Sequence, residues 1–240
     1  AVAVVSSEII ETLKPTRIEQ ALQGQVAGVN IVSNSGSPGA PSTISIRGIS
    51  TNGDNQPLIL VDGTVVEDLS VINPNDIETI NILKDATAGI YGVRAANGVI
   101  LITTKSGRKN MPLSVEYNAY GGVQETTRKL PMLNSTEYAL LLNEAFAANG
   151  DSLPYPNISG LGQGTDWQDQ VFESAPIFSN AITLKGGGEK STYVFGSSIL
   201  DQDGIVGGSK AKFTRLTKRL GYSLDFLENF KLNTGITWTH

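Results

Sequence analysis

The 240-residue sequence contains no cysteine and only one histidine, His240, which is its last residue. Without thiols, these residues form no disulfide bond, no thiolate zinc site and no catalytic thiol. A single terminal histidine leaves little basis for a Ser-His-Asp triad or a histidine-ligated metal site. The sequence also shows no nucleophile–base pair and no phosphate-binding loop. We therefore predict that the protein is not an enzyme and that it holds no cofactor and no metal.

An excess of basic residues and a long apolar run are missing as well. Lysine and arginine number 18 against 23 acidic residues, giving a net charge of −5, so the chain lacks the electrostatic footprint of a nucleic-acid-binding protein. No apolar run approaches the ~18 residues of a membrane-spanning helix. A spanning β-strand needs only ~9–11 residues that alternate between an apolar and a polar side. An outer-membrane barrel is therefore still compatible with the composition.

Residues 43–107 carry a series of short strand patterns with a turn signal between nearly all of them. Leu58–Val61 is a continuous apolar run, and Asp62-Gly63 follows it directly, which predicts a β-hairpin. Asn73-Pro74 predicts a helix cap with proline at the first helical position. Asn97-Gly98 predicts a turn into a further strand. The segment is predicted to be a compact α+β module with no room for a large pocket of its own.

The order and spacing of the motifs in this segment carry a family resemblance. The motifs are Ile46-Arg47-Gly48, Leu60-Val61-Asp62-Gly63, Asn73-Pro74-Asn75-Asp76-Ile77-Glu78, Leu83-Lys84-Asp85-Ala86, Ile90-Tyr91-Gly92, Arg94 and Ala96-Asn97-Gly98-Val99-Ile100. Together they resemble the plug domain of TonB-dependent outer-membrane transporters, and within them the SusC/RagA family. The motif residues are Arg47, Gly48, Asp62, Gly63, Asn73, Asp76, Glu78, Lys84, Asp85, Tyr91, Gly92, Arg94, Asn97 and Gly98.

The residues before this segment predict a strand, a helix and a loop. Residues 1–5 are an apolar, strand-like run, so we expect the sequence to be an internal part of a longer precursor. Thr16 and Glu19 form a capping box for a helix that Gly28 ends. Residues 33–41 are rich in glycine, proline and serine and are predicted to be a surface loop.

From residue 113 onward the pattern changes to sustained alternation. On the predicted strand from Arg215 to Phe226, apolar side chains lie on one side and mainly polar ones on the other, with Lys218 as the exception. Tyr222 and Trp238 suit an aromatic girdle. Residues 130–175 form a long excursion with a helix capped by Asn134, whereas other turns are short. This asymmetry is typical of an outer-membrane barrel.

The predicted fold class is an α+β plug domain followed by the antiparallel strands of an incomplete outer-membrane β-barrel. The domains are a plug at 1–107, a linker at 108–112 and the first barrel strands and loops at 113–240. The family barrels have roughly 22 strands around a plugged lumen, so only a few of them fit here. As an alternative to the transporter, the alternation fits a soluble glycan-binding or adhesin module with one buried sheet face.

The resemblance implies a gate in the bacterial outer membrane that imports glycans or peptides. It implies energy from TonB, through a segment upstream of Ala1 that these residues do not contain, and a SusD-like lipoprotein as partner. We expect several charged motif residues to pair with each other or with the barrel wall, or alternatively to stabilise the plug only internally. The polar loop tip is a hypothetical substrate contact formed by Asn52, Asp54, Asn55 and Gln56.

Overall fold

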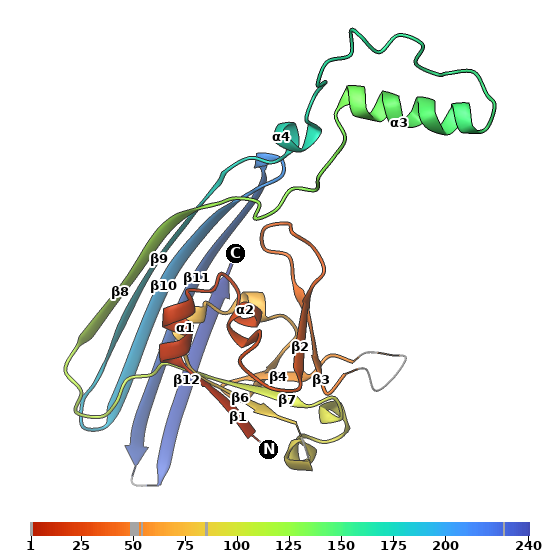
Figure 1. The fold of residues 1–240 in the computed structure, drawn as a ribbon. Helices are drawn as coiled ribbons and strands as arrows, with labels where there is room; N and C mark the ends of the chain where they lie inside the picture. The colour runs from red at the N-terminus through yellow and green to blue at the C-terminus, as the bar shows by residue number, and fades with distance from the viewer. Residues whose placement is uncertain (1, 49–52, 54, 85, 228) are drawn as a thin grey trace.

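The computed structural model describes residues 2–48, 53, 55–84, 86–227 and 229–240. It divides into an N-terminal body and a curved antiparallel sheet that passes along one side of that body (Figure 1). We call residues 2–104 the inner body. We call the curved antiparallel sheet that follows it, from β8 (Ser114–Gln124) to β12 (Phe230–Thr239), the wall. The two parts correspond to the predicted α+β module and the predicted barrel strands.

The inner body is built on a five-stranded sheet of order β1-β6-β7-β4-β5. The strands are β1 (Val2–Ser6), β4 (Leu58–Val61), β5 (Thr64–Val66), β6 (Ile77–Leu83) and β7 (Val99–Thr104), and a separate two-stranded ribbon pairs β2 (Val29–Ser33) with β3 (Ser42–Ile46). Of the strand pairs in the described part of this sheet, β4–β7 is parallel and the others are antiparallel. Two α-helices and four 3₁₀ turns complete it: α1 (Ser7–Leu13), α2 (Ile18–Leu22), η1 (Leu69–Val71), η2 (Pro74–Asp76), η3 (Ala86–Tyr91) and η4 (Val93–Ala95).

One apolar core holds the helices, the ribbon and the sheet together. Ile10 of α1 and Leu22 of α2 are fully buried against Ile80, Ile82 and Ile100 of the central strands. Full burial of an aliphatic side chain contributes about 1.5–3 kcal/mol relative to exposure. The helices are too short to be stable alone, so this packing stabilises them.

The predicted turns of the inner body are confirmed. Asp62 and Gly63 have φ of 48° and 86°, the left-handed pair that a two-residue hairpin with right-handed strand twist requires. Asn73 caps η2, because its Oδ1 accepts a hydrogen bond of 3.1 Å from the Asn75 N–H. Gly98 has φ of 94° and leads directly into β7.

The capping box predicted from Thr16 and Glu19, for the helix observed as α2, is wrong. The helix before it, α1, was not predicted. α2 begins at Ile18, and Gln20 rather than Glu19 satisfies the chain before it: its Oε1 accepts from Thr16 N (3.0 Å) and Arg17 N (3.4 Å). Glu19 instead turns inward. The helix ends at Leu22, before the predicted end at Gly28, because Gln23 already has an extended backbone conformation. The preceding helix, α1, was missed because no turn residue separates it from β1.

The wall consists of five antiparallel neighbours in the order β8-β9-β10-β11-β12. Their bounds are β8 (Ser114–Gln124), β9 (Ala175–Gly187), β10 (Ser191–Gly204), β11 (Gly208–Leu227) and β12 (Phe230–Thr239). Short turns join β9 to β10 and β11 to β12 at one end of the wall (Figure 1). The sheet does not close within the described residues. An α+β body followed by antiparallel strands in an open sheet is the architecture that the sequence predicted.

The excursion between β8 and β9 extends beyond the opposite end of the wall (Figure 1). It contains α3 (Ser135–Ala148) and α4 (Trp167–Val171). The predicted cap of α3 is confirmed: Asn134 accepts from Glu137 N and donates its own N–H to the Glu137 carboxylate, both at 2.9 Å. In the part of the chain that the structure describes, no helix combines the length and the apolar character needed to cross a membrane.

The apolar side of the wall faces away from the inner body. Tyr117 on β8 is 66% exposed, and Phe178, Leu220 and Ile236 on other strands are exposed with it. The side facing the inner body is covered and mixed: Ser179, Ser198, Arg215 and Thr217 are buried there together with Ile177, Val194 and Leu200. Lys218, the exception on the apolar side, places its Nζ 5.7 Å from the centre of the Trp238 ring, a cation–π contact. In a soluble protein, the apolar side of such a sheet would be buried and the polar side exposed.

Candidate functional site: the contact between inner body and wall

Arg219 of β11 joins the wall to two elements of the inner body. Its Nη1 donates to the Lys105 carbonyl oxygen at 2.8 Å, and its Nη2 donates to Thr104 Oγ1. The same Nη2 lies 3.9 Å from Asp62 Oδ2. Asp62 in turn accepts from Thr104 N at 2.9 Å and from Thr104 Oγ1. One guanidinium group therefore connects β11 with the β4–β5 turn and with the end of β7; we call this set the Arg219 clamp.

Lys105 forms the second connection. Its Nζ donates to Glu11 Oε1 of α1 at 2.8 Å and to Glu116 Oε2 of β8 at 3.2 Å, and Lys185 of β9 also donates to Glu116. The Lys105 side chain is only 6% exposed. Burial alone would lower the pKa of Lys105, but hydrogen bonds and charges from Glu11 and Glu116 outweigh burial and raise it. The ammonium is held in its charged form between helix and wall.

Asp76 fills the space between these two connections. Its N–H donates to the Asn73 carbonyl oxygen at 2.9 Å, and its own carbonyl oxygen accepts from Lys105 N at 2.8 Å. The carboxylate lies against the wall at Gly196, where a Cβ would stand 2.8 Å from Asp76 Oδ1. Burial raises the pKa of Asp76, and the charges of Arg219, Lys105 and Arg215 offset that effect only in part.

The raised pKa of Asp76 makes its contribution to stability depend on pH. The native state holds the proton more tightly than the unfolded state, so ionisation of Asp76 destabilises the inner body as pH rises through the carboxylate range. We expect Asp76→Asn to be more stable than wild type at pH about 7 and equal to it at pH about 3, where both carry a neutral side chain. Urea unfolding at the two pH values measures the difference; equal midpoints at neutral pH would contradict it.

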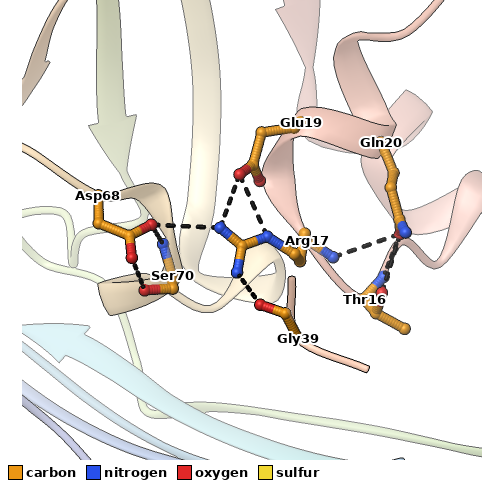
Figure 2. Close-up of polar contacts among 7 residues, drawn as sticks. All are labelled: Thr16, Arg17, Glu19, Gln20, Gly39, Asp68 and Ser70. Carbon is orange, nitrogen blue, oxygen red and sulfur yellow. Dashed lines mark hydrogen bonds and ion pairs between the residues drawn. The ribbon is translucent and has the colours of Figure 1, made fainter. Parts of the chain in front are cut away.

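Arg17 is the centre of a third polar cluster, within the inner body (Figure 2). Its Nη2 donates to Glu19 Oε1 at 2.7 Å and to Asp68 Oδ1 at 3.2 Å, and its Nη1 donates to the Gly39 carbonyl oxygen at 2.8 Å. Arg17 and Glu19 are 5% and 3% exposed. Glu19 Oε2 has no hydrogen-bond partner among the described residues. The cluster ties α2 to the loop after β2 and to η1.

The loop held by Arg17 also touches the wall. A Cβ at Gly39 would come within 2.2 Å of Phe213 Cδ2 on β11, so only glycine fits between Arg17 and the wall. Residues 33–37 of this loop are exposed as predicted, but residues 38–40 are half-buried. Arg215 of β11 is buried nearby and lines a small polar cavity of about 50 Å³ with Asn73, Tyr120 and others, which has room for a few water molecules.

Three of the other charged motif residues, Lys84, Glu78 and Arg47, contact the inner body or the residues after it. Lys84 Nζ donates to the Ala27 carbonyl oxygen, and Glu78 lies 3.9 Å from the Arg108 guanidinium. Arg47 has φ of 62°, and its N–H donates to the Gly28 carbonyl oxygen at 2.8 Å. Arg94 is exposed, and Asp85 lies outside the described residues. The structure thus brings Asp62 and Asp76 to the wall, whereas pairing roles for the others stay predictions.

The neutral motif residues form turns and packing. Gly48, Gly63, Gly92 and Gly98 all have positive φ. Tyr91 packs against a small cluster of buried residues, namely Leu60, Leu83, Ala95 and Val99. Of the predicted substrate-binding tip, Asn52 and Asp54 lie outside the described residues, Asn55 donates to the Gly53 carbonyl oxygen at 3.0 Å, and Gln56 is exposed. Asn97 is half-buried at the turn before Gly98.

Gly98 is the motif glycine with the least space. A Cβ there would stand 2.7 Å from Ile46 Cδ1 and 3.2 Å from the Leu83 carbonyl oxygen, on a backbone with φ of 94°. We expect Gly98→Ala to destabilise the inner body by about 2–3 kcal/mol, from backbone strain and displaced core atoms. Gly63→Ala is the matched control, because its φ is 86° but no atom lies within 4 Å of its Cβ. Its cost should be about 1–2 kcal/mol; urea midpoints that are equal for both variants would contradict the steric part.

Several residues of the contact and of the Arg17 cluster were not predicted as site residues. Arg219 and Arg215 were placed only on the polar side of a strand, and Glu116 has the same signal on β8: a charged residue at an inward position of an alternating pattern. Lys105 and Asp68 carry no such signal, because each acts through residues distant in sequence. The alternation along a strand identifies Arg219, Arg215 and Glu116. Only the folded chain identifies Lys105 and Asp68.

Comparison with known proteins follows the same division of the chain. Residues 1–99 match the family model "TonB-dependent Receptor Plug Domain". The chain is 38% identical over 226 residues to TonB-dependent receptor SusC of Bacteroides thetaiotaomicron, covering 89% of this chain and 22% of that protein. It is also 38% identical to TonB-dependent receptor P26 of Formosa agariphila, covering 98% of this chain and 24% of that protein.

Solved structures agree in fold over the full chain. The structure of the RagAB peptide importer in its closed-closed state matches 100% of this chain and 30% of that chain, with a TM-score of 0.83 and 29% identity. The chain thus spans less than a third of the length of each of these relatives. With its plug domain seated against an unclosed antiparallel sheet, the chain belongs to the SusC/RagA-type TonB-dependent transporters, as the motifs predicted.

Proposed function

We propose that the chain supplies the plug and first wall strands of an outer-membrane importer of glycans or peptides. The observation that carries the proposal is the chemistry of the contact: Arg219 and Lys105 join the inner body to the wall through charge-assisted hydrogen bonds, and the Asp76 carboxylate lies against Gly196. Charge-assisted hydrogen bonds at such a contact can exchange with water when the plug moves. The exposed apolar side of the wall is suited to lipid.

TonB is the proposed energy source, acting through a segment upstream of Ala1. Among the described strands, β1 is an edge strand with β6 as its one neighbour, so force on the N-terminal side reaches the sheet at its edge. α1 follows directly and is joined to the wall by the Glu11–Lys105–Glu116 bridge. Edge elements with few partners open at low free energy. The order of release would be β1, then this bridge, then the Arg17 cluster.

A SusD-like lipoprotein is the proposed partner on the outer side, and the cargo is a glycan or a peptide. The structural relative is named a peptide importer, and SusC is named only as a TonB-dependent receptor. The excursion with α3 and α4 lies at the end of the wall opposite the β9–β10 and β11–β12 turns, and long loops of outer-membrane barrels face the exterior. We propose the tip with Asn55 and Gln56 as a substrate contact.

Deletion and uptake experiments test this function. In the native bacterium, loss of the gene, of the neighbouring lipoprotein gene or of TonB should each abolish uptake of the same glycan or peptide. Detergent-free solubility of the full-length protein would instead support the soluble glycan-binding or adhesin module. Uptake that persists without TonB would reject the energised mechanism.

The exposed motif arginines give a second test. We propose that Arg47 and Arg94 contribute to holding the plug in the complete barrel. Arg47→Ala and Arg94→Ala in the full-length protein should alter uptake and the protease sensitivity of the plug. Wild-type values in both assays would reject a role for these two side chains in the gate.

A further inference from the structure

The small polar cavity of about 50 Å³ lies where the turn between α1 and α2 and the start of η2 meet the wall. Its wall side crosses four strands in one row, because strand register aligns Tyr120, Ser179, Leu200 and Arg215 on β8, β9, β10 and β11. On the opposite side it is lined by Asn73, the cap of η2. Both parts of the structure therefore contribute to the cavity.

Arg215 carries a buried positive charge into this cavity. The residue is 5% exposed, and its Nη1 is covered and has no hydrogen-bond partner in the described part of the chain. None of the ion pairs among the described residues includes Arg215. By contrast, the equally buried Arg17 is paired with Glu19, which does not line the cavity. Because buried charges are ordinarily paired, the guanidinium group of Arg215 points to a counter-ion.

Two acidic residues of the inner body lie near this charge, and neither provides that counter-ion. Glu11 lines the cavity, but its Oε1 already accepts from Lys105 Nζ at 2.8 Å. The charge of Arg215 acts on Asp76, yet burial raises the pKa of Asp76 and so disfavours its ionised form. The Asp76 carboxylate also lies against Gly196 and does not line the cavity. The positive charge at the cavity is therefore only partly compensated by these two residues.

The rest of the lining supplies groups that can bind a small anion. Asn73 and Asn118 carry amide N–H groups and Tyr120 carries a hydroxyl, and all of these can donate hydrogen bonds. Lys14 lines the cavity and is exposed, so a second positive charge stands where the cavity meets solvent. A volume of about 50 Å³ has room for a few water-sized particles, which excludes a sugar or an amino acid. One uncompensated guanidinium group matches one negative charge.

We infer that this cavity binds a small monovalent inorganic anion such as chloride, with Arg215 and Asn73 as donors. The inference goes beyond the proposed import function and does not depend on the cargo. Arg215 belongs to the wall and Asn73 to the inner body, so the anion binds only while the two are in contact. A ligand that binds one state shifts the equilibrium toward that state. The anion therefore stabilises the seated form of the plug.

Bromide tests the site directly in the full-length protein. Crystals soaked in sodium bromide should show an anomalous scattering peak within hydrogen-bond distance of the Arg215 guanidinium group. This measurement needs no variant, so it holds even where a substitution at Arg215 prevents folding. Water alone at that place, or a carboxylate from another part of the full-length chain, would overturn the inference.

Protease accessibility of the plug in the full-length protein, at constant ionic strength, tests the effect on seating. Replacing chloride by gluconate, which is too large for the cavity, should raise the cleavage rate about tenfold where chloride stood at about ten times its dissociation constant. Arg215→Met should be cleaved at the same rate in both salts. Arg108→Met is the matched control: it removes an arginine that is 83% exposed and should keep the wild-type response.

Three results of the protease assay would overturn the proposal. The first is a wild-type cleavage rate that is the same in both salts, and the second is an Arg215→Met protein that still responds to chloride. The third is an equal loss of response in Arg108→Met, which would assign the effect to screening of surface charge. Failure of the import function is distinct, because neither measurement depends on uptake.

Discussion

Arg17→Met is expected to destabilise the inner body by about 3–5 kcal/mol, the cost of leaving one member of a buried ion pair without its partner. The substitution removes the donors to Glu19, Asp68 and the Gly39 carbonyl oxygen. Asp68 is half exposed and regains water, but Glu19 is 3% exposed and keeps one oxygen already without a partner among the described residues. The uncompensated Glu19 carboxylate therefore accounts for most of the loss.

A double variant separates charge from packing. Arg17→Met with Glu19→Gln removes the orphaned charge, so most of the lost stability should return. Arg108→Met is the matched control, because that guanidinium group is 83% exposed and lies 3.9 Å from Glu78; pairs of this kind contribute about 0–1 kcal/mol. The measurement is the urea midpoint for proteolysis of the plug in the full-length protein. Equal midpoints for the single and double variants would show that packing, not charge, dominates.

The parts of the fold that follow from short-range chemistry were predictable. Asp62-Gly63 and Asn97-Gly98 specify turns by backbone preference, and the Asn134 cap specifies the start of α3. α1 was missed because it follows β1 without a break and has no cap hydrogen bond from a side chain. Its stability comes from burial of Ile10 in the core, which local sequence does not reveal.

The candidate site was predictable only in part, for a related reason. Alternation along β11 predicts that Arg215 and Arg219 lie on the polar side of the strand. It does not predict which residues they contact. Asp62 was known as a turn residue, but its contact with Arg219 joins positions far apart in sequence. Such pairings depend on how the inner body sits against the wall. Motif residues therefore identified the family, whereas the folded chain identified the contacts.

The Arg219 clamp leads to the second large prediction. Truncating one partner of a hydrogen-bonded charge pair at an interface costs about 2–5 kcal/mol. Arg219 is well covered, with its side chain 11% exposed, while Asp62 is 47% exposed, so a value near the lower end, about 2–3 kcal/mol, is expected for Arg219→Ala. Since 1.4 kcal/mol is a factor of ten, the open form of the contact should rise about 30- to 150-fold.

The readout is protease accessibility of the β4–β5 turn in the full-length protein, which reports the population of the open contact. Lys218→Ala is the control, since the neighbouring side chain points outward over Trp238 and touches no part of the inner body in the described contacts. Arg219→Lys keeps the charge but cannot bond the Lys105 carbonyl and Thr104 together with one planar group, so it should lie between wild type and Arg219→Ala. If both Arg219 variants were cleaved at the wild-type rate, the guanidinium group would not hold the plug, and the remaining contacts with the wall, through Lys105, Asp76 and Gly39, would account for its position.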